Sequence, residues 1–270
     1  MTNKKDVAQI VIRSQFEDGE KYMLALRTND EFYEWIGGKK EEGESIEEAA
    51  VREMKEEIEI DWRDSDFTVE KLGDSYLSSK DERFRLNPIL IKIKGSVARK
   101  IGDEDLSEEH SKLEWIDITS FDEYETLGQY KALEHLEVVN GRVALAAVRN
   151  NDRILLVQRS EENSTPGKWG LVSGGMESGE EPQETATREL REETGLEAKP
   201  VDKGEFFIGE GELGYWRLEP VLMEQVDGEV DLNWELSQHE WLKPQEILER
   251  DKIGRMKGLE NLGLMKDGDR

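Results

Sequence analysis

One segment of this chain occurs twice, and the repeat constrains the fold more than any other feature. The second copy runs from Gly174 to Leu196 and reads GGMESGEEPQETATRELREETGL; the first runs from Gly38 to Ile60 and reads GKKEEGESIEEAAVREMKEEIEI. The copies begin 136 residues apart in a chain of 270 residues. We therefore expect a duplicated module and two domains, 1–139 and 140–270, each long enough to bury a core.

Each copy has the pattern of an amphipathic helix. In the first, Ser45 is a favourable N-cap with Glu48 three residues later, and apolar residues recur as far as Met54 at helical spacing. This predicts a helix over Ser45–Ile58. In the second copy, Pro182 suits the first helical position, and Gly195 suits the left-handed residue that ends a helix.

The predicted helices carry carboxylates at spacings i, i+3 and i+4, which share one helix surface. These are Glu53, Glu56 and Glu57 in the first copy and Glu189, Glu192 and Glu193 in the second. Hard oxygen ligands suit Mg2+, with Mn2+ possible, and the chemistry implied is displacement at phosphorus by an activated water. The alternative is a solvated acidic helix face. The glycines before the helices allow close backbone approach to phosphate: Gly37, Gly38, Gly174 and Gly175.

Both segments resemble the Nudix box, the signature of the Nudix hydrolases, which reads G-x5-E-x7-R-E-U-x-E-E-x-G-U, with U aliphatic. The second copy matches every fixed position, whereas the first has Glu59 in place of the second glycine. The resemblance implies an α/β (α+β type) fold, with two α/β/α sandwich domains that each contain a mixed sheet. It also implies that Arg52 and Arg188 orient the neighbouring glutamates. The fixed acids Glu44 and Glu180 are supporting residues in this interpretation.

The substitution at Glu59 changes the expected helix end. Glycine takes positive φ freely and glutamate does not, so we expect the helix to continue past Glu59 in preference to forming a strained turn. The metal-site carboxylates of the first copy are all present, so we expect this site to bind metal as well. The alternative is one catalytic domain beside a nucleotide-sensing or structural half.

A further carboxylate precedes a tryptophan in each half. Glu109 and Glu235 lie six residues before Trp115 and Trp241. In many Nudix enzymes a loop glutamate near this point completes the metal site or acts as the base, so these two are our candidates. An exposed loop acid is the alternative interpretation, and Glu114 and Glu240 are the next candidates.

Aromatic and basic residues near the expected cleft are candidates for substrate contact, although most tryptophans are core residues. The leading candidates are Arg159, Lys168, Trp216 and Trp35, with Phe32, Tyr33, Arg83, Arg85, Tyr215, Arg217 and Trp234 nearby. The three histidines, His110, His135 and His239, show no metal-binding spacing, and the sequence predicts no chemistry for them.

The composition limits the partners. A formal net charge of −26 disfavours nucleic acid and anionic membranes, but bound metal lets a small anionic nucleotide approach. The excess of acidic residues fits either salt adaptation or an ordinary acidic enzyme. The chain has no cysteine, no long apolar stretch and no signal-peptide core, so we expect a cytoplasmic protein. Many Nudix enzymes are homodimers, so the resemblance implies a monomeric pseudo-dimer or a homodimer.

Strand-like segments surround both predicted helices. We expect strands at 7–14, 21–27, 67–77, 84–94, 142–149, 154–159, 201–208 and 215–225. The function predicted is a Mg2+-dependent Nudix pyrophosphohydrolase that cleaves a nucleoside diphosphate linked to another moiety. The substrate classes left open are nucleoside triphosphates, ADP-ribose, dinucleoside polyphosphates and nucleotide sugars.

Overall fold

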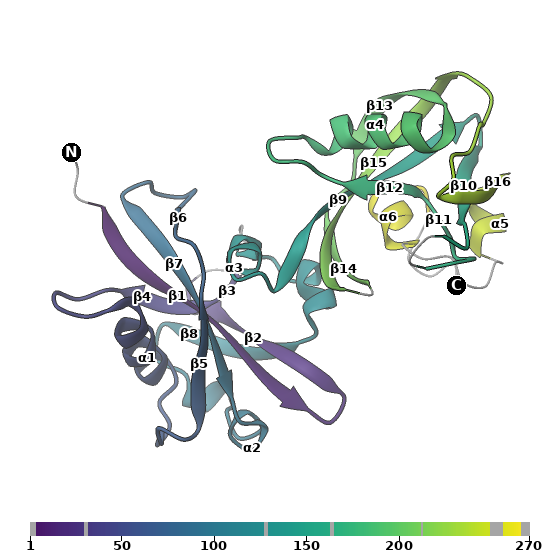
Figure 1. Ribbon diagram of the computed structural model, residues 1–270. Coiled ribbons are helices and arrows are strands. Elements are labelled where there is room, and N and C mark those ends of the chain that lie inside the picture. The colour runs from purple at the N-terminus through teal and green to yellow at the C-terminus, as the bar shows by residue number, and fades with distance from the viewer. Residues whose placement is uncertain are drawn as a thin grey trace. The chain divides into compact units, whose positions relative to one another are not determined.

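The computed structural model describes residues 4–29, 32–126, 129–162, 165–211, 213–248 and 256–265. The chain divides into two compact units, Met1–Val139 and Asn140–Arg270. Each unit contains its own sheet and its own helices (Figure 1).

The first unit alternates strands with short helices. Its strands are β1 (Lys5–Phe16), β2 (Gly19–Arg27), β3 (Tyr33–Glu34), β4 (Ile36–Lys39), β5 (Phe67–Leu72), β6 (Tyr76–Leu77), β7 (Phe84–Ile93) and β8 (His110–Ile116). Its helices are α1 (Ile46–Glu57), α2 (Gly95–Ala98) and α3 (Tyr130–His135), with 3-10 turns η1 (Asp103–Asp105) and η2 (Ile118–Glu123).

The second unit repeats this order. Its strands are β9 (Val139–Asn150), β10 (Arg153–Arg159), β11 (Trp169–Gly170), β12 (Val172–Gly175), β13 (Glu197–Lys203), β14 (Phe207–Gly211), β15 (Gly214–Asp227) and β16 (Leu236–Leu242). Its helices are α4 (Pro182–Thr194), α5 (Pro244–Leu248) and α6 (Met256–Asn261).

Equivalent strands pair in the same order in the two sheets. The described strands of the first run β3-β2-β1-β7-β5 and those of the second β11-β10-β9-β15-β13. In the first sheet β1 and β7 are parallel, whereas β1 is antiparallel to β2 and β4, so the sheet is mixed. The mixed sheets that the sequence analysis predicts are therefore confirmed.

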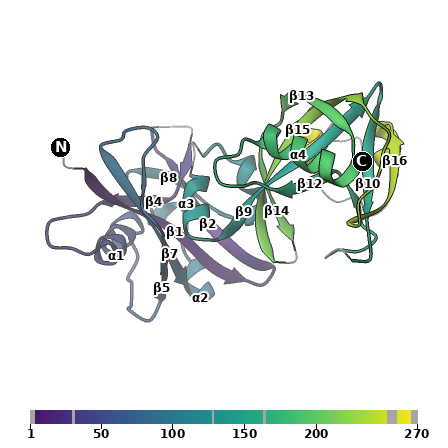
Figure 2. The ribbon, with the colours of Figure 1, turned by 45° about the horizontal axis from the view of Figure 1, so that its top comes forward.

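Helices cover both faces of each sheet. In the second unit, Ala186 and Leu190 of α4 share a core cluster with Ala144 of β9, whereas the adjacent Leu145 packs with Leu259 of α6 on the other face. This alternation follows from the two-residue period of a strand. Figure 2 shows α4 lying along its sheet in the second unit. The result is the α/β/α sandwich that the sequence predicts.

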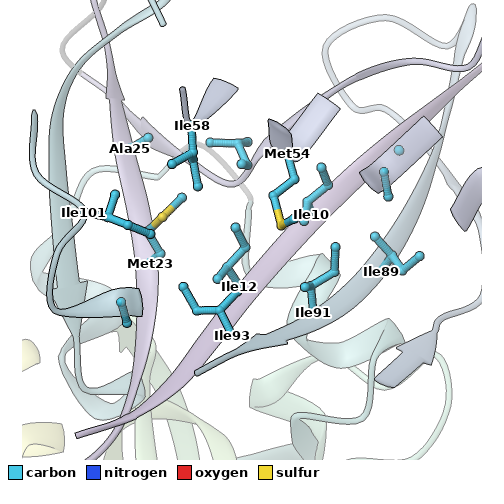
Figure 3. Packing of buried hydrophobic residues seen from close by; sticks show 14 of the residues in the cluster. Ile10, Ile12, Met23, Ala25, Met54, Ile58, Ile89, Ile91, Ile93 and Ile101 are labelled. Atoms are coloured by element: carbon cyan, nitrogen blue, oxygen red, sulfur yellow. The ribbon is translucent and has the colours of Figure 1, made fainter. Parts of the chain in front are cut away.

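The helix of each repeated segment is anchored by buried apolar side chains. Met54 and Ile58 lie in a cluster with Ile10, Ile12 and Ile91, and all five are at most 1% exposed (Figure 3). Burial of such a side chain stabilises a fold by about 1.5–3 kcal/mol. This packing fixes the position of the opposite, acidic surface of the helix.

The helix starts agree with the sequence. Ser45 accepts a hydrogen bond from the Glu48 N–H, and the Glu48 side chain accepts one from Ser45 N–H, which completes a capping box. Pro182 opens α4, and Gly195 closes it at φ 67°. These caps satisfy backbone groups that a helix leaves without intrahelical partners.

The expected continuation of the first helix past Glu59 is wrong. Helix α1 ends at Glu57, and Ile58 is already extended, with φ −119° and ψ 97°. The N–H of Glu59 donates to the carbonyl of Asp105 at 2.7 Å, and Ile58 forms a bridge with Leu106. The chain leaves the helix as an extended strand-like segment, so it needs neither extension nor a left-handed turn.

Two predicted strands are each divided at a glycine. The segment 67–77 splits around Gly73, where a Cβ atom would lie 2.5 Å from the carbonyl oxygen of His135. The segment 201–208 splits around Gly204, where a Cβ atom would lie 2.8 Å from the carbonyl oxygen of Asn261. Backbone from a later helix approaches at both points, a tertiary contact that strand periodicity does not encode.

Candidate functional site

The candidate site of each unit begins where a glycine-containing strand passes beside the acidic helix. Gly38 in β4 pairs with Ala8, and Gly174 in β12 pairs with Ala144. A Cβ atom on Gly38 would lie 2.1 Å from Cδ of Glu53, and one on Gly174 would lie 1.9 Å from Cδ of Glu189. In both units, therefore, a helix carboxylate occupies the space that any larger residue would need.

The other two candidate glycines are not equivalent in the two units. Gly37 has φ 152°, and a Cβ atom there would lie 2.1 Å from the carbonyl oxygen of Ala8, so close backbone packing requires glycine. Gly175 faces open space, with nothing within 4 Å of an added Cβ atom. Its carbonyl accepts a hydrogen bond from Arg188 at 3.1 Å.

An arginine connects the parts of the site in each unit. Arg52 donates to Glu44 at 2.7 Å, to Glu53 at 2.8 Å and to Glu56 at 2.9 Å, and its Nη2 donates to the carbonyl of Lys39 at 3.0 Å. The guanidinium therefore ties the strand before the helix to the helix itself. Hydrogen bonding to Arg52 lowers the pKa of Glu44 to about 2.

Arg188 makes the equivalent contacts in the second unit. It donates to Glu180 at 3.2 Å and to Glu189 at 2.6 Å, and it lies 3.7 Å from Glu192. Hydrogen bonding to Arg188 lowers the pKa of Glu180 to about 2. The predicted supporting residues thus lie where they can orient the carboxylates.

The carboxylates of each helix have different environments. The side chains of Glu56 and Glu192 are 59% and 61% exposed. Glu57 and Glu193 are buried, each at 6% exposure. Glu189 lies between these extremes, and its pKa is raised first by burial and then by the nearby charges of Glu192 and Glu235, against the hydrogen bond from Arg188.

The loop glutamates are placed differently in the two units. Glu109 is exposed, and its carboxylate lies 3.9 Å from Arg27. Glu235 is half-buried and near enough to raise the pKa of Glu189 by its charge. The alternatives Glu114 and Glu240 lie within strands β8 and β16.

A histidine for which the sequence predicted no chemistry lies beside the first site. His110 is buried, with Nδ1 3.1 Å from Glu57 and Nε2 3.5 Å from Glu34. Burial opposes its charge, but the carboxylates of Glu34 and Glu57 outweigh this effect and raise the pKa of His110 to about 9. The hydrogen bonds from His110 and Ser107 lower the pKa of Glu57 despite its burial. Sequence spacing gave no signal, but a comparison of the two halves at matched positions would have found this residue.

One of the predicted substrate contacts lies in the core. Trp35 is 3% exposed, stacks on Phe121 with ring centroids 5.6 Å apart, and donates to the carbonyl of Gln129 at 2.9 Å. Its place in the packed interior leaves no surface for a substrate, so this part of the prediction is corrected. An aromatic residue before the box is ambiguous because core and cleft positions look alike in sequence.

The remaining substrate candidates are more accessible. Arg159 donates to the Thr165 hydroxyl at 3.0 Å, and Lys168 is exposed. Trp216 is half-buried beside the cluster that packs against α6. Contact of these three residues with substrate therefore stays a prediction.

A surface hollow of about 740 Å³ lies beside α4. Its lining includes Arg188, Arg191 and Glu192, together with Thr187 and Pro200. The lining therefore combines two guanidinium groups with the carboxylates of Glu184 and Glu192.

The donor groups fit a hard divalent cation. Glycine leaves room for the carboxylate of Glu189, and Glu193 and Glu192 extend from the same helix. Among the residues that the structure describes, no three acidic or histidine side chains already converge as ion ligands. Arg188 donates to Glu189 and lies 3.7 Å from Glu192, whose side chain is 61% exposed.

Within the described part of the chain, none of the helices combines the length and the apolar character needed to cross a membrane.

Comparisons with known proteins agree with the duplicated architecture. A model described as the NUDIX domain matches residues 4–136 and again residues 139–262. The nucleoside triphosphatase NudI of Escherichia coli (strain SE11) is 28% identical over 130 residues, which cover 42% of this chain and 92% of NudI. An octanoyltransferase of Myxococcus xanthus is 35% identical over 122 residues, covering 40% of this chain; the chain spans only 32% of that relative's length. The crystal structure of the MutT protein from Methanosarcina mazei Go1 has 25% identity and a TM-score of 0.39, covering 45% of this chain and 90% of that one.

Proposed function

Because the chain belongs to the NUDIX domain family, we propose that it is a Mg2+-dependent hydrolase of phosphoric anhydride bonds in small nucleotides. Its two family domains and its similarity to a nucleoside triphosphatase support an enzyme that cleaves pyrophosphate linkages. The proposed domains are residues 1–139 and 140–270. In the reaction, water attacks phosphorus and the anhydride P–O bond breaks, which releases a nucleoside monophosphate and a phosphorylated product or pyrophosphate.

One observation carries this proposal. In both units the glutamate that follows the arginine, Glu53 or Glu189, fits against a glycine and is held by that arginine. The repetition supports a function for the arrangement beyond solvation of an acidic helix. A glycine that leaves space for one particular glutamate side chain is expected in a site that must hold carboxylate oxygens at a defined place.

The proposed metal ligands of the second unit are Glu189, Glu192 and Glu193, and those of the first are Glu53, Glu56 and Glu57. A bound Mg2+, with Mn2+ as a possible substitute, supplies neutralisation of phosphate charge and a more acidic water. Arg188 orients Glu189 and is itself held by Glu180. Glu235, which lies near Glu189, is the proposed acceptor of the water's proton.

The substrate is proposed to be a nucleoside diphosphate linked to another group. Candidates are nucleoside triphosphates, the class in the name of the relative NudI, and ADP-ribose, dinucleoside polyphosphates and nucleotide sugars. Arg188 and Arg191 in the lining of the hollow are guanidinium groups that can contact the phosphates of such anions. The net charge of −26 disfavours a long nucleic acid as substrate.

A panel assay tests this proposal. The full chain is incubated with one compound of each class in the presence of Mg2+, Mn2+ or excess chelator, and the products are identified by chromatography. We expect a nucleoside monophosphate from at least one class, formed only with metal. The double variant Glu56→Gln/Glu192→Gln, which alters both proposed sites and is prepared in parallel, controls for contaminating phosphatases. Absence of product from every class with both metals contradicts the proposed function.

A further inference from the structure

The loop that carries Glu235 is tied to the C-terminal end of helix α4 by backbone hydrogen bonds. The N–H of Asp231 donates to the carbonyl of Thr194 at 2.8 Å, and the N–H of Asn233 donates to the carbonyl of Glu193 at 2.9 Å. The loop therefore connects Glu193, a proposed metal ligand, with Glu235, the proposed acceptor of the water's proton.

The side chain of Asn233 extends this connection to Glu235. Its Oδ1 atom accepts a hydrogen bond from the N–H of Glu235 at 2.9 Å, and its carbonyl accepts one from the N–H of Leu236 at 3.3 Å. An asparagine that accepts from the N–H two residues later fixes a turn. On the other side, the carbonyl of Glu235 accepts from the N–H of Ser160, the residue that follows β10, at 2.8 Å. Both backbone groups of Glu235 are thus held.

The first unit has the same backbone arrangement, with Ser107 in place of the asparagine. The N–H of Ser107 donates to the carbonyl of Glu57 at 2.9 Å, and its carbonyl accepts from the N–H of His110 at 3.1 Å. The carbonyl of Glu109 accepts from the N–H of Thr28, the residue that follows β2, at 2.8 Å. The two loops therefore meet their helices and strands in the same way.

The side chains at this turn differ between the units. The hydroxyl oxygen of Ser107 lies 3.4 Å from the N–H nitrogen of Glu109, beyond the usual range for a hydrogen bond of this kind, whereas the amide oxygen of Asn233 is at 2.9 Å from its partner. Serine makes such a turn more weakly than asparagine. The side chain of Glu109 is 65% exposed, and Glu235 is half-buried. The glutamate of the second unit is thus the more firmly held.

We propose that Asn233 is a positioning residue for hydrolysis by the second unit, because its amide oxygen fixes Glu235 relative to the metal ligand Glu193. This inference rests on the proposed function, in which Glu235 accepts the proton of the attacking water. A base must lie within hydrogen-bond reach of the proton that it removes, and a displacement of about 1 Å in a reacting site is costly.

A double-mutant cycle in the full chain tests this role. All variants carry Glu56→Gln, which disables the proposed first site, and turnover is measured with Mg2+ on a compound that this parent hydrolyses. We expect Asn233→Ala to lower kcat on the order of tenfold to a hundredfold with little change in KM. In a parent that also carries Glu235→Gln, Asn233→Ala should lower kcat by less than about twofold, because the group that it positions is already lost.

A purely structural role of Asn233 gives a different result. If its loss only loosens the fold, kcat falls by the same factor whether residue 235 is glutamate or glutamine. The Mg2+ concentration for half-maximal turnover separates the two roles again. It should stay within about twofold in Asn233→Ala, because the hydrogen bond to the carbonyl of Glu193 comes from the backbone and survives the substitution.

Two further variants identify the hydrogen bond as the cause. Asn233→Ser supplies the acceptor that the first unit uses, so it should keep more turnover than Asn233→Ala but less than the parent. Asn150→Ala is the matched control: it removes an exposed asparagine side chain that donates to Gln225 at 2.6 Å at the end of β9, and it should keep the turnover of the parent.

Folding of each variant is checked by circular dichroism. If Asn233→Ala does not fold, Asn233→Ser takes its place in the cycle, with a smaller loss expected. Equal turnover of folded Asn233→Ser and Asn233→Ala overturns the hydrogen bond as the cause.

The outcomes separate this inference from the proposed function. Parent turnover by a folded Asn233→Ala, or an equal loss with and without Glu235, overturns the role of Asn233 alone. Hydrolysis by wild type but not by the Glu56→Gln parent places the reaction in the first unit and also overturns only this inference. Parent turnover by Glu235→Gln overturns the assigned base together with the role of Asn233. Absence of metal-dependent product from wild type contradicts the proposed function itself, and this inference with it.

Discussion

A Cβ atom on Gly174 would lie 1.9 Å from Cδ of Glu189, so the helix carboxylate occupies the space of the missing side chain. Nothing larger than glycine fits at this strand position unless the carboxylate moves. The contact atoms belong to the end of a flexible side chain, so movement is easy for the fold but harmful to a site that needs a defined carboxylate position.

Gly174→Ala should therefore separate activity from stability. We expect turnover by the second unit to fall by roughly a hundredfold, the effect of a misplacement of about 1 Å in a reacting site. The free energy of unfolding should change by less than about 1 kcal/mol. Steady-state kinetics and urea unfolding measure the two effects. Gly175→Ala adds the same methyl group in open space and should cause a smaller loss of turnover. Wild-type turnover from a folded Gly174→Ala variant would contradict the proposed role of Glu189.

Glu235→Gln tests the proposed base. The side chain keeps its size but cannot accept the water's proton, so we expect turnover to fall about 10²–10⁴-fold with little change in KM. Glu240→Gln is the matched comparison, since Glu240 lies within β16 opposite Leu156, and its loss should be smaller. A larger loss for Glu240→Gln than for Glu235→Gln would assign the role to the other glutamate.

The loss of unfolding free energy at acidic pH should depend on Glu180. Its hydrogen bond with Arg188 lowers its pKa from 4.5 to about 2 in the folded chain. A carboxyl group whose pKa is lower in the folded chain than in the unfolded chain stabilises the fold fully at pH values above its unfolded-chain pKa. This stabilisation is lost as the pH falls toward its folded-chain pKa. The difference in unfolding free energy between wild type and Glu180→Gln should thus be constant above pH ~5 and shrink at lower pH. Urea titrations across this range measure it; a difference that stays constant to pH ~3 would count against the ion pair.

Two substitutions at matched helix ends should both destabilise, for different reasons. Gly195 has φ 67°, so Gly195→Ala should cost on the order of 1 kcal/mol because alanine is strained there. Glu59 is not among the described residues with positive φ, so Glu59→Gly should cost about 0.4–1 kcal/mol through the entropy of the unfolded chain. Urea unfolding of both variants gives the comparison. A stabilising Glu59→Gly would reveal strain at that residue.

Local signals in the sequence predicted the repeated helices well. The cap at Ser45, the proline at 182 and the left-handed glycine at 195 act within a few residues of their own positions, and all three have the predicted geometry. The fold class was implied by the resemblance of the repeated segments to the Nudix box, and the strands predicted around the helices from local periodicity agree with it.

The features that sequence missed depend on contacts between distant segments. His110 reaches Glu57 across 53 residues, and no spacing rule links them. Helix α1 ends early because Glu59 bonds to Asp105, a partner outside the repeated segment. Trp35 lies in the core because it stacks on Phe121, and an aromatic residue alone does not distinguish core from cleft.

Turnover of the Glu192→Gln variant tests the central claim most directly. This substitution removes the charge of a carboxylate that is 61% exposed, so the fold should be little affected. In a Glu56→Gln background, which disables the proposed first site, we predict that turnover of the Mg2+-dependent substrate falls at least about a hundredfold on adding Glu192→Gln while the unfolding curve is unchanged. Turnover within about tenfold of that parent would contradict the claim that the carboxylates of this helix hold the catalytic metal.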